Sequence, residues 1–149
     1  MKSSSVVALF GEAEKGDLQT IYFCNSLGQL FDFFGHPPQD TTGLFYAIQA
    51  LLYGKSLIYF RVHEEGLSDK DYLFGLHLMR EYSTSIPKLS ALFLPQVGSQ
   101  AIINEGLELC QAHQGILLMQ EADFYDYLTD FTKGPNSEPP IKGNWPLAA

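Results

Sequence analysis

The residue types that most often carry out chemistry are few in this chain and are spread along it. The four histidines are His36, His63, His77 and His113. None belongs to an HExxH motif or to another paired metal-ligand spacing. The two cysteines, Cys24 and Cys110, form no CxxC motif and are too few for a disulfide framework. We therefore expect no metal site and no cofactor, surface or packed histidines, and buried thiols that act as small hydrophobic groups.

Gly98 and Ser99 lie at an expected turn from a strand into a helix, where two kinds of chemistry occur. A serine nucleophile at such a turn needs the pattern Gly-x-Ser-x-Gly, whereas the sequence here is VGSQA. A helix N-terminus can bind phosphate, but this loop lacks GxGxxG and an adjacent lysine. The pattern favours Ser99 as a plain N-cap. The alternative is a ligand site of His63, Gly98 and Ser99; a hydrolase using Ser99, His63 and an acid is less favoured.

The loop GEAEKGD, residues 11–17, is flanked by glycines as phosphate-binding loops are. It lacks the Gly-Lys-Ser/Thr ending of such loops, and Glu12 and Glu14 would repel a phosphate. We interpret it as a solvated loop or as a contact surface for another protein, with Glu12, Glu14 and Asp17 as the candidate interface residues.

A cluster of acids near the C-terminus raises the question of cation binding. The acids are Glu121, Asp123, Asp126 and Asp130. No glycine-containing calcium loop surrounds them. Acids in the first turn interact favourably with the helix dipole, so we interpret this segment as a solvated, capped helix.

Short apolar runs alternate with amphipathic segments along most of the chain. The expected strands cover residues 6–10, 21–24, 56–62, 89–94 and 115–119. The expected helices cover residues 27–34, 43–53, 69–82, 100–113 and 123–131. This alternation predicts a three-layer α/β fold, with a mostly parallel central sheet of about five strands and helices on both faces.

Several local features make this prediction specific. Ser26 is the expected N-cap of the first helix, and Gly35 is its expected end. Residues 68–71 resemble a capping box with Asp in the third helical position. Ile58 is expected in a central strand, residues 115–119 are expected to form the last core strand, and the helix at 100–113 is expected to bury the following side chains: Ile102, Ile103, Gly106, Leu107 and Cys110.

Composition limits the classes of function. The chain has 149 residues, and its hydrophobic content of 46% indicates a globular protein. A net charge of -8 opposes binding to nucleic acid or to an anionic membrane. The five apolar residues that precede Gly11 are too few for a signal peptide or a membrane span, so we expect a cytoplasmic origin.

We expect one domain over residues 1–131 and an extended tail rich in proline and glycine over residues 132–149. Large aromatic side chains are enriched where protein surfaces become buried against partners. Trp145 and Pro146 are therefore candidate interface residues, because this tail has no periodicity that would fold by itself.

The residues of the first sixty positions also carry a resemblance. An apolar strand, then Gly11-Glu12 and Gly16, then Ser26, Leu30 or Phe31, Phe34 and Gly35 resemble the opening of the core domain of contractile tail sheath proteins. The similarity continues through Ala47, Leu51, Leu52, Gly54 and residues 58–62, and more loosely through residues 89–119. Three positions depart from the family pattern: Asp17 replaces a proline, Tyr53 an asparagine and Lys55 a glycine.

The resemblance implies a structural protein and not an enzyme. It would be a sheath-like subunit, cap or adaptor of a phage-tail-like or injection machine, and it would act by binding copies of itself or other tail proteins. It would be cytoplasmic or incorporated in a phage-like particle. In the family, terminal arms of one subunit pair with a neighbour's sheet, and this chain lacks the second half that supplies much of that linkage. The rival hypothesis is a regulatory α/β domain that binds a small molecule or nucleotide beyond the carboxyl ends of the strands.

Overall fold

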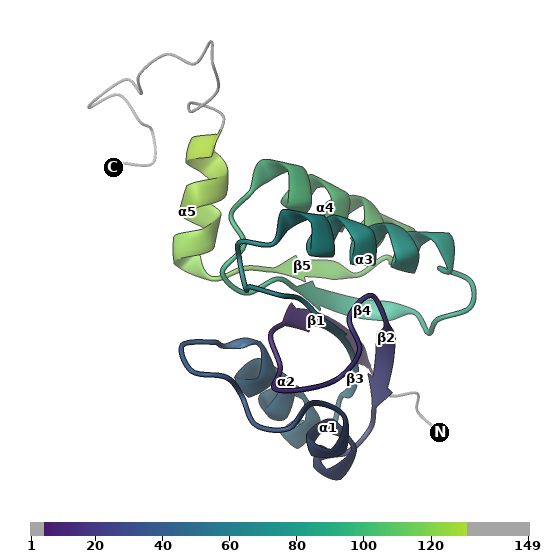
Figure 1. Cartoon of the computed structure of the whole chain (residues 1–149). Helices are drawn as coiled ribbons and strands as arrows, with labels where there is room; N and C mark the ends of the chain where they lie inside the picture. The colour runs from purple at the N-terminus through teal and green to yellow at the C-terminus, as the bar shows by residue number, and fades with distance from the viewer. Residues whose placement is uncertain (1–4, 131–149) are drawn as a thin grey trace.

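A five-stranded sheet lies between two layers of helices, which confirms the expected three-layer α/β fold (Figure 1). The computed structural model describes residues 5–130. In this part of the chain the elements are β1 (Val6–Gly11), β2 (Ile21–Cys24), α1 (Leu27–Phe34), α2 (Gly43–Leu52), β3 (Ser56–Arg61), α3 (Asp69–Glu81), β4 (Leu89–Phe93), α4 (Gln100–His113), β5 (Ile116–Leu118) and α5 (Glu121–Asp130). Among these residues, no helix combines the length and hydropathy that a membrane span requires.

The strand order is β2-β3-β1-β4-β5, so β1 lies in the centre. β3, β1, β4 and β5 are parallel, and only β2 runs antiparallel to its neighbour. Ala8 on β1 pairs with Ile58 on β3 and with Leu92 on β4. The predicted interior position of Ile58 is confirmed, because its side chain is fully buried. An unbroken apolar run is typical of a strand that is covered on both faces.

The two helical layers cover different parts of the sheet. On one face α2 contacts β1 and β3, and α1 contacts β2. On the other face α3 packs along α4, and α4 contacts β4 and β5. Each layer has its own hydrophobic core, and the α3–α4 layer has the larger one. The layers are therefore offset. Tyr46 of α2 reaches toward β5, because its ring centroid lies 4.5 Å from that of Phe93 on β4 and its hydroxyl accepts the side-chain amide of Gln120.

The ends of the helices agree only in part with the expected capping. Ser26 is confirmed as an N-cap, because its hydroxyl accepts the backbone N–H of Gln29 at 3.2 Å. Gly35 is confirmed as the end of α1, with a φ of 73° that favours glycine. The expected capping box at Ser68 is wrong. The Ser68 hydroxyl bonds the backbone of Glu64, and Asp71 accepts the backbone N–H of His63 at 2.8 Å.

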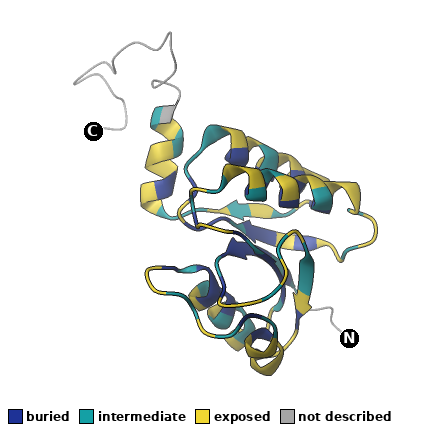
Figure 2. Cartoon of the chain, viewed as in Figure 1, coloured by how far each residue is buried: buried dark blue, intermediate teal, exposed yellow. Residues whose placement is uncertain are grey.

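The last strand differs most from expectation. Instead of a core strand over residues 115–119, β5 is a three-residue strand at the edge of the sheet. Its outward side chains are exposed, and Figure 2 shows this beside the buried strands of the centre. Leu107, expected inside, is 40% exposed, whereas Leu109 is fully buried. The apolar run predicted a strand correctly, but a run of this length cannot tell an edge from a centre.

The buried centre of the sheet gives a first prediction. Ile58→Asp places an unpaired charge in the core and should lower the free energy of unfolding by more than about 4 kcal/mol, so that the domain unfolds. Phe23→Asp is the matched control, because Phe23 is the register partner of Ile58 on β2 and is 40% exposed. We expect urea melts followed by circular dichroism to show a folded control. A folded Ile58→Asp variant would contradict the position of β3.

Candidate functional site

In open α/β sheets, ligands bind beyond the carboxyl ends of the strands where the strand order reverses. Here that place lies between β1 and β4, because the chain adds β3 on one side of β1 and β4 on the other. The side chain of Glu65, from the loop that follows β3, fills this position. Glu65 is only 7% exposed, so a carboxylate is buried where a ligand would be expected.

Five donors surround the Glu65 carboxylate, and the most distant of them is the Thr42 hydroxyl at 3.3 Å. It accepts the backbone N–H of Thr42 at 2.9 Å and of Gly43 at 2.8 Å, both at the start of α2. It accepts the backbone N–H of Glu12 at 2.9 Å, just after β1. The last donor is the side-chain amide of Gln96, at 2.9 Å. The bonds compensate the cost of burying the charge, because hydrogen bonds to an ionised acceptor are stronger than neutral ones.

Glu65 takes the place of a local helix cap. Thr42 stands at the N-cap position of α2 but makes no capping bond with its own side chain. The Glu65 carboxylate satisfies the N–H groups that would otherwise lack partners, and its charge interacts favourably with the positive end of the helix dipole. Residues far apart in the sequence therefore meet at one group.

Two glycines make room for this arrangement. A Cβ atom added to Gly43 would lie 2.8 Å from Glu65 Oε2 and 2.8 Å from the Cα of Gly11. Beside them, the hydroxyl of Tyr59 donates to the carbonyl of Glu12 at 2.9 Å. Burial, and then the Glu65 carboxylate, raise the pKa of Tyr59 well above its ordinary value. The cluster is consequently tightly packed, and the position that a phosphate would take at the start of α2 already holds a negative charge.

The residues of the alternative ligand site lie in separate local contacts. The exposed ring of His63 has Nδ1 2.6 Å from Asp71 Oδ2. Burial acts to raise the pKa of Asp71, but the bonds from His63 lower it overall. Ser99 is the N-cap of α4, as expected, but its hydroxyl makes no capping bond. A Cβ atom at Gly98 would lie 2.6 Å from Asp126, so this glycine allows α5 to pack closely.

The candidate interface residues of the first loop do not share one environment. Glu12 is half-buried, and its carboxylate accepts the backbone N–H of Glu65 at 3.0 Å. Glu14 is exposed and accepts the backbone N–H of His36 at 2.9 Å, which lowers the pKa of Glu14. Asp17 is exposed. Trp145 and Pro146 lie outside the described residues.

Two of the expectations for the chemically active residue types, those for the cysteines and for the histidines, can be checked directly. Cys24 and Cys110 are confirmed as buried thiols, and burial raises the pKa of each to about 11. His113 is buried and accepts the backbone N–H of Leu89 at 3.1 Å, and burial lowers its pKa. Within residues 5–130, no group of three or more His, Cys, Asp and Glu side chains has a geometry that could hold a metal ion.

The sequence indicated that the acidic segment of α5 is solvated. This is wrong for Asp123. Asp123 is 7% exposed and accepts the backbone N–H of Gln96 at 2.7 Å, which fixes the start of α5 to the loop after β4. The burial raises the pKa of Asp123, whereas the bond from Gln96 lowers it in part. Asp123 thus has a structural role that the helix-dipole argument missed.

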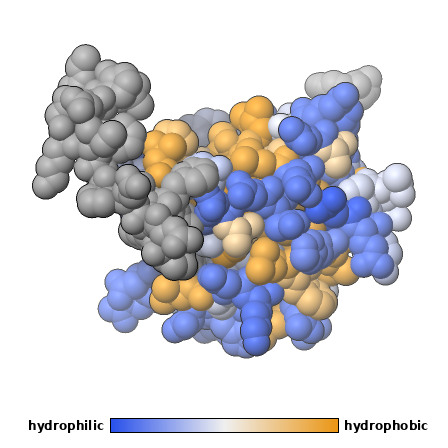
Figure 3. Space-filling model, turned by 90° about the horizontal axis from the view of Figure 1, so that it is seen from above, coloured by the Kyte–Doolittle hydropathy of each residue, from blue (hydrophilic) through white to orange (hydrophobic). Residues whose placement is uncertain are grey.

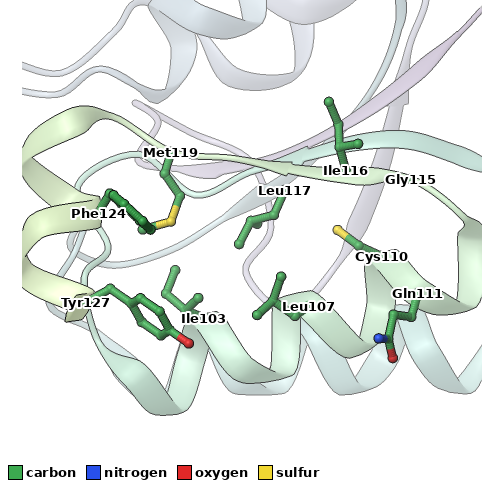
Figure 4. A pocket seen from close by; sticks show the side chains of 10 residues that line it. All are labelled: Ile103, Leu107, Cys110, Gln111, Gly115, Ile116, Leu117, Met119, Phe124 and Tyr127. Atoms are coloured by element: carbon green, nitrogen blue, oxygen red, sulfur yellow. The ribbon is translucent and has the colours of Figure 1, made fainter. Parts of the chain in front are cut away.

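A second region, at the β5 edge of the sheet, is a hydrophobic groove of about 530 Å³ between α4, β5 and α5 (Figure 4). Its lining is Ile103, Leu107, Cys110, Gln111, Gly115, Ile116, Leu117, Met119, Phe124 and Tyr127. Figure 4 shows Leu117 pointing toward α4 and Ile116 pointing to the opposite side of β5. This region offers contact area and almost no group that could do acid–base or nucleophilic chemistry.

Sequence reasoning missed both Glu65 and the groove. Glu65 lies in the segment HEEG, which the sequence indicates only as a polar turn. Two features of the sequence could have indicated the role of Glu65. Glu65 follows a central strand, and the helix that it caps begins with a glycine, Gly43. The groove depends on β5 being at an edge, and no local pattern reveals that.

A search of protein-family models and a search of curated proteins found no match to this chain.

Glu65→Gln tests the buried carboxylate. The new amide presents two N–H donors to a site built from donors, so the free energy of unfolding should fall by about 3 kcal/mol. Glu14→Gln, at an exposed position of the loop after β1, is the control and should change the stability little. Urea unfolding of both variants measures the difference. Equal stabilities would contradict the role assigned to Glu65.

Asp123→Asn tests the buried acid by its pH dependence. Because the folded protein raises the pKa of Asp123 above its ordinary value of 3.8, the native state holds the proton more tightly than the unfolded state. The wild-type protein should lose stability relative to Asp123→Asn as the pH rises from 3.8 through that raised pKa. Unfolding at a series of pH values measures the difference. Asp69→Asn on α3 is the exposed control; a wild-type protein that keeps or gains stability relative to Asp123→Asn as the pH rises would contradict the assignment.

Proposed function

We propose that this protein is a structural or assembly component that works by binding other proteins through the open edge of its sheet at β5. The observation that carries the proposal is the exposure of Ile116 (60%) and Leu118 (39%) on an edge strand. Unpaired strand edges bind further strands, and proteins that do not use such an edge usually protect it with charge, proline or a covering segment. β5 has the sequence ILL and contains neither charge nor proline.

The surroundings of β5 support the same proposal. Leu107 on α4 and Phe124 on α5 are 40% and 48% exposed beside the hydrophobic groove. Figure 3, which views the molecule from above Figure 1, shows hydrophobic side chains gathered in patches between hydrophilic ones. Exposed apolar side chains around a groove are typical of contact sites. A strand edge beside an apolar groove can provide backbone hydrogen bonds and side-chain pockets to the same partner.

The proposal includes a narrower assignment, which the sequence resemblance alone supports. In this assignment the protein is a sheath-like subunit, cap or adaptor of a contractile tail-like or injection machine. It binds itself or other proteins of that machine, without nucleic acid or membrane, and it is cytoplasmic or part of a phage-like particle.

A second candidate is a regulatory domain that binds a small molecule. The specific observation in its favour is the groove, since about 530 Å³ lies within the range of small-molecule pockets. An apolar ligand is the chemistry that this lining would accept. A nucleotide is disfavoured, because the Glu65 carboxylate lies where its phosphate would bind.

Leu118→Lys and Phe23→Lys provide a matched test of the proposed function. The two side chains are equally exposed, at 39% and 40%, and lie on opposite edges of the sheet. In this test, the chain is co-expressed with each of the proteins whose genes lie next to the gene of this chain. We expect a partner to co-purify with the wild-type and Phe23→Lys proteins and at least tenfold less with Leu118→Lys.

Two results would contradict the proposal. One is equal retention of the partner by both variants. The other is micromolar binding of ATP, GTP or NAD to the purified chain in calorimetry, which would favour the regulatory domain.

A further inference from the structure

We propose that His113 is an acid-sensitive latch, in which the neutral imidazole holds the last turn of α4 on the start of β4 and protonation of the ring releases it. The latch lies directly before β5, because only Gln114 and Gly115 separate His113 from the first residue of that strand. The latch is a property of this chain by itself, whereas its control of partner binding rests on the proposed function.

The His113 ring is buried where α4 contacts β4. It is 4% exposed, and its Nδ1 atom accepts the backbone N–H of Leu89 at 3.1 Å. A ring nitrogen that accepts a hydrogen bond carries no proton, so the proton of the neutral ring is on Nε2. Nε2 is also buried, and none of residues 5–130 forms a hydrogen bond with it. The geometry therefore fits the neutral ring and provides no partner for a charged one.

Protonation would place two donors against each other. The imidazolium ring has a proton on both nitrogens, so Nδ1–H would face the Leu89 N–H instead of accepting it. Leu89 is buried, and a buried donor that loses its acceptor is destabilising. Burial lowers the pKa of His113 below its ordinary value of 6.5, and the charge of Lys88 lowers it further. The stability that the latch contributes is therefore complete above pH 6.5 and is lost as the pH falls through the lowered pKa.

The charged groups around the ring do not compensate an added proton. Lys88, which precedes β4, donates to the side chain of Gln114 at 2.7 Å and places a positive charge beside the ring. β1, β4 and β5 contain no charged residue. Glu81, at the end of α3, is exposed. The thiol of Cys110, one turn before His113, is neutral because burial raises its pKa to about 11.

The acids of the helices around α4 are engaged elsewhere. Glu105 and Glu108 of α4 lie 3.1 and 2.7 Å from the guanidinium group of Arg80 on α3. The acidic helix α5 contacts α4 through Asn104, which is more than two turns before the ring. No carboxylate from these helices is therefore placed to stabilise an imidazolium among the described residues.

The C-terminus of a helix normally favours a positive charge. At the end of α4 two of the last carbonyls already have partners, because Cys110 accepts the N–H of Gly115 at 2.9 Å and Gln111 accepts that of Gln114 at 3.2 Å. The ring bonds Leu89 instead of these carbonyls, so the helix dipole does not offset the burial. The net effect on the ring is a lowered pKa.

Release at His113 would reach β5 through a close backbone contact. A Cβ atom added to Gly115 would lie 2.5 Å from the carbonyl oxygen of Leu89, the residue that donates to the ring. Gln114 has a φ of 59°, and the chain turns there from α4 into β5. β5 pairs with β4 immediately after this corner. When the ring leaves, the corner loses its bond to Leu89, and the pairing of β5 with β4 loses its support.

The test compares the wild-type chain with His113→Asn, in which an amide oxygen can replace Nδ1 as the acceptor and no group titrates. His36→Asn is the control, because the side chain of His36 is 76% exposed. Amide exchange of each full chain is measured by NMR at about pH 8 and about pH 5, the range in which histidine titrates, and is expressed as protection factors.

We expect the protection of Leu89 and of the β5 amides to fall at least about fivefold at the lower pH in the wild-type and His36→Asn proteins. The protection should stay unchanged in His113→Asn, and the amides of β3 should keep theirs in all three proteins. The nitrogen chemical shifts of the wild-type ring should show a neutral ring with the proton on Nε2 at about pH 8.

Three results would overturn the latch. One is a His113 ring that is charged in the folded chain at pH 6.5 or above. Another is Leu89 protection that is equal at both pH values in the wild-type protein. The third is an equal loss of protection in His113→Asn. If His113→Asn does not fold, the wild-type titration decides, because the latch requires the ring to become charged and Leu89 to lose protection at one common midpoint.

Retention of a co-purifying partner at the same two pH values tests the control of β5. It should fall at least about fivefold at the lower pH with the wild-type chain and not with His113→Asn. Equal retention by the wild-type chain at both pH values contradicts this control. A wild-type chain that retains no partner at either pH contradicts the proposed function, whereas the exchange of the isolated chain still decides the latch.

Discussion

The buried carboxylate of Glu65 is the interaction on which the described part of the molecule depends. It binds the start of α2, the residue after β1 and the loop after β4, and it comes itself from the loop after β3. Four segments of the chain therefore converge on two oxygen atoms. A buried charge is tolerated only when its donors are all in place, so these segments must assume their positions together. Asp123 extends the same network, because it accepts the backbone N–H of Gln96, whose side chain contacts Glu65.

This arrangement has a functional consequence. The part of an α/β sheet that most often holds a ligand is filled by the protein's own side chain, and the glycines around it leave little space. At the β5 edge of the sheet the opposite holds, because the apolar side chains of Ile116 and Leu118 are exposed there. These exposed apolar side chains are the feature of the described residues that supports the proposed contact surface. The proposed association through β5 would explain why an edge strand with the sequence ILL carries no protecting charge.

The sequence predicted the elements and their layers well, because the apolar runs and the helical stripes are local signals. It also predicted the cap at Ser26 and the buried position of Ile58. It failed at β5, because burial at an edge depends on which strand lies beside it, and this is a property of the whole sheet. Leu107 was misplaced for a related reason, since it lies just beside the buried stripe of α4. Glu65 and Asp123 were missed because their partners are far away in the sequence, and an acid with distant donors has the same local pattern as a solvated one.

Hydrogen–deuterium exchange of the full chain, at low and high protein concentration and with any partner that co-purifies, tests the central claim most directly. We expect the backbone amides of residues 116–118 to exchange more slowly when a second chain is bound, and those of β2 not to change. Unchanged exchange at β5, together with protection around Glu65 on addition of a small ligand, would contradict it.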